Sequence, residues 1–147
     1  MARRRPVRKS LAIKVLEITE YEPSGAGCDT HVIPNPTWKQ VEAAIRALNH
    51  YCLPFIFIGL QDECFGENCL SVLGGPNGYA ITAADAEGAW LQYCDPTHTG
   101  GEVPVWTSDQ GFYPSERHVT YDLDLVLRVA RHYAERGELD PSVQWEE

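Results

Sequence analysis

The first part of the chain alternates apolar and polar residues in the way that a half-buried strand does. Leu11 and Ile13 are apolar, and Lys14 and Glu17 interrupt the apolar run. A period of two is typical of a strand, so a strand is predicted over residues 10–21. Prolines and glycines then punctuate residues 22–36, which we expect to form a loop.

The pattern changes to a helical period after this loop. Between residues 37 and 48, Val41 and Ile45 belong to a stripe of apolar residues that recur every three to four positions. Thr37 and Gln40 have the spacing of a capping box at the start of the stripe. These features predict an amphipathic helix.

A second helix is predicted near the end of the chain, where either Asp122 or Tyr121 opens an apolar stripe and Gly137 closes it. A short polar residue before a helix and a glycine after it are the expected caps. The predicted buried side chains are Leu123, Val126, Leu127, Ala130, Tyr133 and Ala134.

The middle of the chain reads as a series of strands. Residues 53–60 are apolar at nearly every position, which is typical of a central strand covered on both faces. Glycines at positions 74, 75 and 78 mark a hairpin turn. The other predicted strands are residues 69–73, 78–82, 89–93, 103–107 and 118–121, with a final edge strand around 143–145.

Together these elements predict a single α+β domain over residues 10–147. It would have a mainly antiparallel sheet of about five to seven strands and two amphipathic helices, because two apolar helix stripes need a shared sheet face to cover. The segment 1–9 holds five of the chain's 12 basic residues and is expected to be a basic flexible tail. The alternative is an arm that contacts nucleic acid or anionic lipid.

Charge narrows the range of partners. Beyond the tail, residues 10–147 carry seven basic and all 21 acidic side chains, a net charge of −14. Phosphates repel such a surface, so direct nucleic-acid binding is not expected. An acidic body suits a basic protein partner.

Targeting and cysteine patterns favour the cytoplasm. No apolar run approaches the roughly 18 residues that span a bilayer, and Lys14 and Glu17 interrupt the segment after the basic start. The five cysteines are odd in number and include no Cys-x-x-Cys spacing, which favours reduced thiols. Cys64 and Cys69, with His31 or His50, are spaced more widely than common zinc ligands, so no metal or other cofactor is expected.

Motifs of catalysis are missing from the sequence. It has no Gly-x-Ser-x-Gly and no His-Glu-x-x-His. Cys94 and His98 are close in sequence, but a catalytic pair must meet in space. Asp122 and Asp124 are ordinary at the start of a helix. The chain is therefore not expected to be an enzyme.

Three parts of the chain resemble a family of bacterial immunity proteins, the Imm-one family, whose members neutralise nucleic-acid deaminase toxins. They are a helix and strand over residues 36–60, the hairpin 73–79, and the ending 137–147 with its Pro-x-x-x-Trp. The resemblance covers about residues 36–147. Gly74, Gly75 and Trp145 match the family pattern as structural residues, and the resemblance assigns no partner contact.

The resemblance implies a cytoplasmic inhibitor that occludes the active site of a cognate secreted toxin. Two rival hypotheses stay open: a small cytoplasmic enzyme with unrecognised cysteine or carboxylate chemistry, and a general acidic protein-binding module. Exposed aromatics would anchor the partner, and acidic residues would form the rim. The candidate partner-binding residues are Asp62, Glu63, Glu67, Glu102, Trp106, Asp109, Phe112 and Tyr113.

Overall fold

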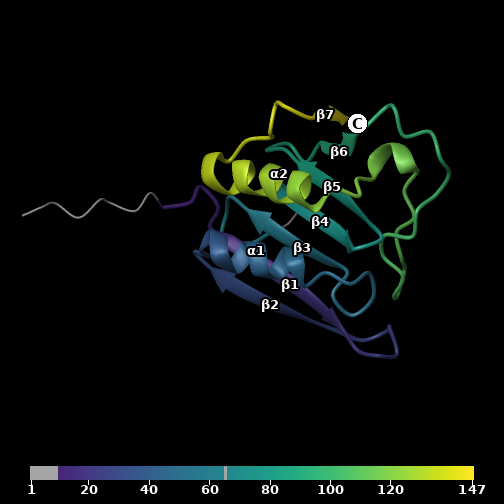
Figure 1. Ribbon diagram of the computed structural model, residues 1–147. Helices are drawn as coiled ribbons and strands as arrows, with labels where there is room; N and C mark the ends of the chain where they lie inside the picture. Colours follow the sequence, from purple (N-terminus) through teal and green to yellow (C-terminus); the bar gives the residue numbers. More distant parts are fainter. Residues whose placement is uncertain (1–9, 65) are drawn as a thin grey trace, which may run out of the picture.

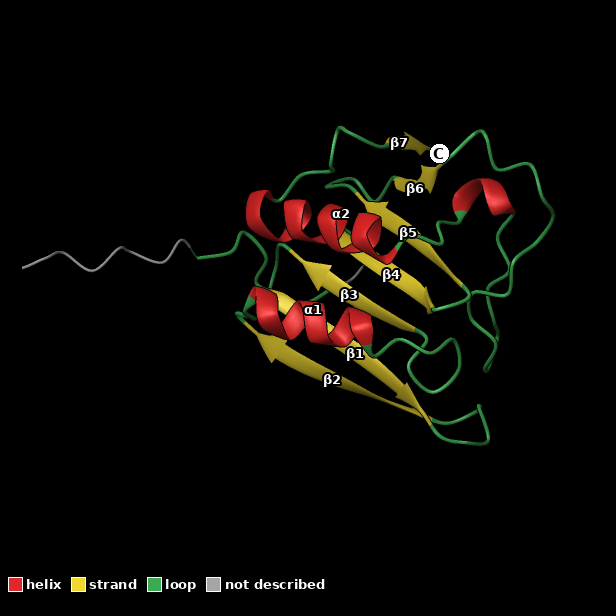
Figure 2. Ribbon diagram, viewed as in Figure 1, coloured by secondary structure: helices red, strands yellow, loops and turns green. Residues whose placement is uncertain are grey.

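Residues 10–64 and 66–147 are described by a computed structural model (Figure 1). They form one seven-stranded antiparallel sheet in the order β2-β1-β3-β4-β5-β6-β7. The strands are β1 (Val15–Tyr21), β2 (Cys28–Pro34), β3 (Phe55–Gly59), β4 (Cys69–Gly75), β5 (Gly78–Ala84), β6 (Trp90–Cys94) and β7 (Gln144–Glu146). Helices α1 (Trp38–Arg46) and α2 (Leu123–Arg136) lie side by side over one sheet face (Figure 2). The predicted α+β class is confirmed. The predicted tail 1–9 lies outside the described residues.

Helix α1 begins at the predicted capping box. The Thr37 hydroxyl accepts a hydrogen bond from the Gln40 backbone N–H at 3.2 Å, and the Gln40 side-chain oxygen accepts one from the Thr37 N–H at 2.9 Å. Two backbone donors that a helix start leaves without partners are satisfied in this way. An i,i+4 ion pair from Arg46 to Glu42 at 2.9 Å lies on the exposed side.

Helix α2 also has the caps that the sequence predicts. The Asp122 carboxylate accepts from the Leu125 N–H at 3.3 Å. Gly137 has the left-handed φ of 69° that ends many helices, and its N–H donates to the Tyr133 carbonyl at 2.8 Å. Both helix ends are therefore specified by local residues.

The main core lies between the helices and the sheet. Ile56 of β3, Val72 of β4 and Ile81 of β5 are at most 1% exposed, and Ile45 and Val129 meet them from the helices. Side chains alternate across a strand, so the residues between these core positions point to the opposite face of the sheet.

The start of the fold differs from the prediction in two places. Strand β1 begins at Val15 rather than at residue 10, because the backbone N–H groups of Ala12 and Ile13 instead donate to the Ala134 carbonyl of α2. The predicted loop 22–36 contains the edge strand β2. Its residues are mostly exposed and lack alternation, and its pairing with β1 from Val15↔Pro34 to Tyr21↔Cys28 makes it a strand.

The predicted strands 103–107 and 118–121 are wrong. The segment forms only isolated bridges, including Trp106↔Phe112 and Tyr79↔Thr120, and a short 3-10 helix, η1 (Glu116–His118). Val105 and Val119 are nonetheless fully buried, against Ala80 of β5. The apolar residues of this segment fill a second, smaller core instead of joining the sheet.

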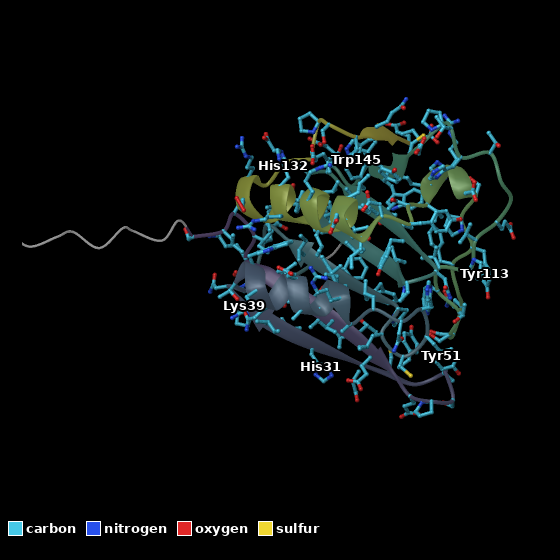
Figure 3. All side chains as sticks on the ribbon, in the orientation of Figure 1. His31, Lys39, Tyr51, Tyr113, His132 and Trp145 are labelled. Atoms are coloured by element: carbon cyan, nitrogen blue, oxygen red, sulfur yellow. The ribbon has the colours of Figure 1, made fainter. Side chains whose placement is uncertain are left out.

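The C-terminus is tied to the sheet through β7, as predicted. Tyr93 of β6 pairs with Trp145, whose indole N–H donates to the Asp140 carbonyl at 3.1 Å. The Trp145 ring is half-buried against the main core, beside α2 (Figure 3). Among the described residues, no helix combines the length and the apolar character needed to cross a membrane.

Candidate protein-binding face

The face of the sheet opposite the helices is only partly covered. Phe57, Ser71 and Thr82 occupy neighbouring strands with the register Phe57↔Ser71 and Ser71↔Thr82. Each alternates with core residues of its strand, so all three lie on this face, which we call the open face. The segment 103–119 packs over one part of the open face through its small core.

A hollow of about 230 Å³, which we call the aromatic groove, lies on the open face between the strands and this segment. It is lined by Phe57, Ser71, Leu73, Thr82, Trp90, Trp106 and Phe112. A second hollow of about 140 Å³ shares Phe57 and Trp90 and extends it toward Gly66 and Gly88. The Trp90 side chain is 47% exposed, so the groove has a large, accessible aromatic on one wall.

Trp106, on the other wall, is held from several directions. Its ring packs edge-on against Phe55 with centroids 5.0 Å apart, and it lies 5.9 Å from the ring of Tyr21. Its indole N–H donates to the Ser108 hydroxyl at 2.9 Å, and that hydroxyl donates to the Tyr51 carbonyl at 2.7 Å. This wall is rigid before any partner binds, which lowers the entropy cost of binding.

His50 braces the segment that carries Trp106. Its Nδ1 is 2.9 Å from the Val105 carbonyl, and its Nε2 is 3.1 Å from the Asn77 backbone N–H. A carbonyl only accepts and an N–H only donates, so the ring is neutral with its proton on Nδ1. The His50 carbonyl also accepts from the Thr107 N–H at 2.8 Å. The segment is thereby fastened to the hairpin of β4 and β5.

Asp109 lies close to the Trp106 wall. Tyr21 donates its hydroxyl hydrogen to the Asp109 carboxylate at 3.1 Å. Burial, with a further contribution from Asp109, raises the pKa of Tyr21 to about 12. The phenol therefore stays protonated and keeps donating this bond at physiological pH.

Charge is distributed unevenly between the two helices and the rest of residues 10–147. Within residues 10–64 and 66–147, the strands contain no lysine or arginine. Five of the seven lysines and arginines in residues 10–147 are on the two helices: Lys39, Arg46, Arg128, Arg131 and Arg136. The helices hold only three of the 21 acidic residues, which leaves 18 acidic and two basic side chains on the strands and connecting segments.

The helix side has its own hollow, of about 740 Å³, and its charged lining residues, Lys14 and Arg131, are basic. It is lined by Ser10, Leu11, Ile13, Lys14, residues 35–38 and Arg131. The Arg131 guanidinium lies 5.5 Å from the centroid of the Trp38 ring. Lys39 lies on the same side of the molecule, on α1 (Figure 3).

The structure brings some of the candidate partner-binding residues together. Trp106 and Phe112 line the aromatic groove, and Asp109 adjoins it through Tyr21. Tyr113 is 49% exposed on the same segment but does not line the groove (Figure 3). Glu102 forms an isolated backbone β-bridge with Ser115 and does not line the groove.

The acidic candidates Asp62, Glu63 and Glu67 lie in the loop between β3 and β4. That loop meets the turn after β5, since the Asn68 N–H donates to the Asp85 carbonyl at 3.0 Å. Glu67 approaches Gly88, which lines the second hollow. Asp62 and Glu63 are exposed but line neither hollow.

Sequence reasoning missed Phe57 and the role of Trp90 in the groove. Phe57 was assigned to a strand buried on both faces, yet it is half-buried at an open groove. The signal was present in the alternation of Phe55 and Phe57 with Ile56 and Ile58. This alternation shows that the strand has two different faces, but it does not show which of them the helices cover.

Side chains considered for catalysis have structural partners. The Cys94 thiol is buried beside Arg117 and Glu146, and burial raises its pKa. His98 instead bonds the Val119 carbonyl through Nδ1 at 2.9 Å. Asp122 caps α2. A raised thiol pKa disfavours the thiolate that a nucleophile needs.

The cysteines and histidines considered as metal ligands do not form a cluster in residues 10–64 and 66–147. The thiols of Cys64 and Cys69 are in hydrogen-bonding contact, which raises the pKa of Cys64 and lowers that of Cys69. His50 is bonded as described above, and His31 pairs with Glu20 at 3.4 Å. No group of three metal-binding side chains forms in these residues.

A solved structure shares the fold. This chain is similar to a hypothetical protein from Neisseria gonorrhoeae with a TM-score of 0.58 and 10% sequence identity, over 95% of this chain and 98% of the other. No family model and no curated protein matches the chain. At 10% identity the likeness shows the fold alone.

Proposed function

We propose that this protein is an immunity protein that binds and inhibits a cognate secreted toxin, a basic domain that acts on nucleic acid, by covering its active site. The observation that carries the proposal is the aromatic groove on the open face, with Glu17 on the same face and Asp109 beside the Trp106 wall. Aromatic anchors surrounded by charge are typical of protein-binding surfaces. The resemblance to the immunity family agrees with this reading and suggests a deaminase toxin.

Charge supports the choice of partner. A toxin that binds nucleic acid needs a positive cleft. Outside the two helices, residues 10–147 carry 18 acidic and two basic side chains, and this negative charge would compete with phosphate for such a cleft. Complementary fields also speed encounter, to as much as about 10⁸–10⁹ M⁻¹s⁻¹ at low salt.

The groove is better suited to binding than to catalysis. Its volume of about 230 Å³ is below the roughly 300–1,000 Å³ of small-molecule sites. Its polar lining consists of the Ser71 and Thr82 hydroxyls, which hydrogen-bond to each other. We therefore propose that the protein is not an enzyme and uses no cofactor.

The cytoplasm is the compartment that this function requires, since the toxin's nucleic-acid target is there. All five cysteines are free thiols, which suits a reducing compartment.

The test first looks for a neighbouring gene that encodes a basic, nucleic-acid-directed toxin domain, and then uses that domain. We expect the purified protein to bind it and to abolish its activity on nucleic acid. Trp90→Ala should weaken binding by about 30-fold, equivalent to the roughly 2 kcal/mol of an interface hot spot. Tyr121→Ala is the matched control because Tyr121 is 51% exposed but does not line the groove, so its affinity should change less than threefold.

Charge reversal tests the steering. Asp62→Lys, on the β3–β4 loop, should slow association, and Asp124→Lys, on α2, should not. Absence of binding at micromolar concentration would overturn the inhibitor proposal for this pair. A toxin domain that binds while its activity continues would also overturn it.

A further inference from the structure

We propose that the aromatic groove is the receptor for a single arginine side chain of the partner, held by its guanidinium over the rings. The inference rests on the proposed function, because it names the residue that a basic partner presents to the open face. It assigns the groove a chemical specificity that a general apolar docking surface would lack.

The lining favours a cation. Phe57, Trp90, Trp106 and Phe112 reach the groove from three separate parts of the chain. Aromatic faces carry negative charge density and attract a guanidinium within about 6 Å of the ring centroid. Because the Trp106 N–H is already bonded to Ser108, its positive edge is occupied within the protein.

The floor of the groove is polar. Ser71 and Thr82 are 5% and 7% exposed, and their hydroxyls bond to each other. One hydrogen of the pair satisfies the bond between them, and both oxygens keep lone pairs that accept further hydrogen bonds. A guanidinium has five N–H donors in a planar fork and uses such acceptors. An apolar side chain would leave these hydroxyl groups with no further partner.

The surrounding charge has the right sign. Glu17 pairs with Phe57 across the sheet and shares the open face with it. Asp109 lies near the Trp106 wall through its bond to Tyr21. In the part of the chain that the structure describes, the seven strands hold no lysine or arginine that would repel an incoming cation.

The same charges argue against the other occupants. A second copy of this chain would bring its own Glu17 and Asp109 to the groove, and like charges oppose that contact. The chain also contains an internal example of the chemistry, since Arg131 lies over Trp38 on the helix side. A guanidinium on an aromatic ring is thus already part of this fold.

The experiment titrates the full chain with three short peptides. They are acetyl-Gly-Arg-Gly-amide, the citrulline peptide with the same shape and no charge, and the norleucine peptide, which is apolar. The readout is the indole N–H signals of the four tryptophans, assigned with single Trp→Phe variants. We expect the arginine peptide to shift the Trp90 and Trp106 signals saturably, with an affinity about 2- to 30-fold higher than that of the citrulline peptide.

A variant tests whether arginine binding depends on the aromatic face of Trp90 or only on an apolar side chain at that position. Trp90→Leu keeps an apolar side chain at an exposed position and removes the aromatic face, so the arginine preference should fall at least to the citrulline level. Tyr121→Leu is the control and should bind the arginine peptide as the unchanged protein does. Equal binding of the citrulline or norleucine peptide would overturn the inference, as would an absence of saturable shifts.

The toxin domain distinguishes the two proposals. If it binds Trp90→Leu as tightly as it binds the unchanged protein, the arginine inference fails and the proposed function stands. If the toxin domain does not bind the unchanged protein, while the arginine peptide still shifts the Trp90 and Trp106 signals of that protein, the proposed function fails. The arginine specificity of the groove then stands.

Discussion

Replacing His50 by alanine tests how the wall of the groove is held. The side chain is 9% exposed and bonds the Val105 carbonyl and the Asn77 N–H. His50 has a positive φ of 69°, but histidine and alanine both carry a Cβ, so this backbone conformation contributes little to the difference. The loss comes from the ring and its two hydrogen bonds.

The expected loss follows from what each partner is left with. Val105 is fully buried, so its unpaired carbonyl costs about 1–3 kcal/mol. Asn77 is exposed, and water replaces most of its bond, which leaves about 1 kcal/mol. The free energy of unfolding should fall by about 2–4 kcal/mol, and a loss of 3 kcal/mol corresponds to about 6–12 °C in melting temperature.

Urea unfolding measures the global effect, and amide hydrogen exchange locates it. Protection at Val105 and Phe112 should fall more than protection in α2, because these amides belong to the segment that His50 fastens. The matched control is His31→Ala, since His31 is an exposed edge-strand residue whose contact with the Glu20 carboxylate is also exposed. Its effect should stay within about 0.5 kcal/mol. A His50→Ala loss below 1 kcal/mol would refute the reasoning.

Three further changes test the chain ends and the hairpin. Trp145→Ala should lower the free energy of unfolding by about 2 kcal/mol, less than for a fully buried tryptophan, because the ring is half-buried. The hydrogen bond from Arg117 lowers the pKa of Glu146 to about 2 from an ordinary 4.5. The folded state is therefore stabilised by the ionised Glu146 above pH 4.5, and this contribution is lost as the pH falls through 2. In an acid titration, Glu146→Gln should lack this pH-dependent contribution to the free energy of unfolding. Gly74→Ala should lower the free energy of unfolding by about 3 kcal/mol or more, since φ is 126° and a Cβ would clash with the backbone across the hairpin. The control is Gly101→Ala, because a Cβ at Gly101 has no atom within 4 Å. This control should change stability by less than about 0.5 kcal/mol.

The helices were predictable because their signals are local. The capping box of Thr37 and Gln40 and the caps of α2 act within a few residues, and the structure confirms both. Strand β2 has no such local signal. Its residues are exposed and its hydrogen bonds come from β1, so a pattern search along the chain finds only glycines and prolines nearby.

The segment 103–121 shows a different limit. Its alternating valines signal burial, and Val105 and Val119 are indeed fully buried. They pack on Ala80 in the small core without extending the sheet. The apolar alternation therefore predicted correctly which side chains are buried. It did not predict whether the backbone pairs with the sheet, because that depends on the rest of the fold.

The candidate site was predictable only in part for the same reason. Trp106 and Phe112 were predicted as exposed aromatic anchors, and they line the groove. Phe57 and Trp90 complete it from β3 and β6, which are not neighbours in the sheet. Their meeting depends on strand order and on the face that the helices leave open, and neither is written in the local sequence.

The two walls of the groove should respond differently to truncation. Trp106 has aromatic neighbours and a hydrogen-bonded indole N–H, so Trp106→Ala should destabilise the fold by about 3 kcal/mol. Trp90 is 47% exposed, so Trp90→Ala should cost less than about 1 kcal/mol. Both should weaken binding of the toxin domain, which makes Trp90 the variant that separates affinity from stability. Equal losses of stability in urea unfolding would show that Trp90 is part of the fold's support and not a free anchor for a partner.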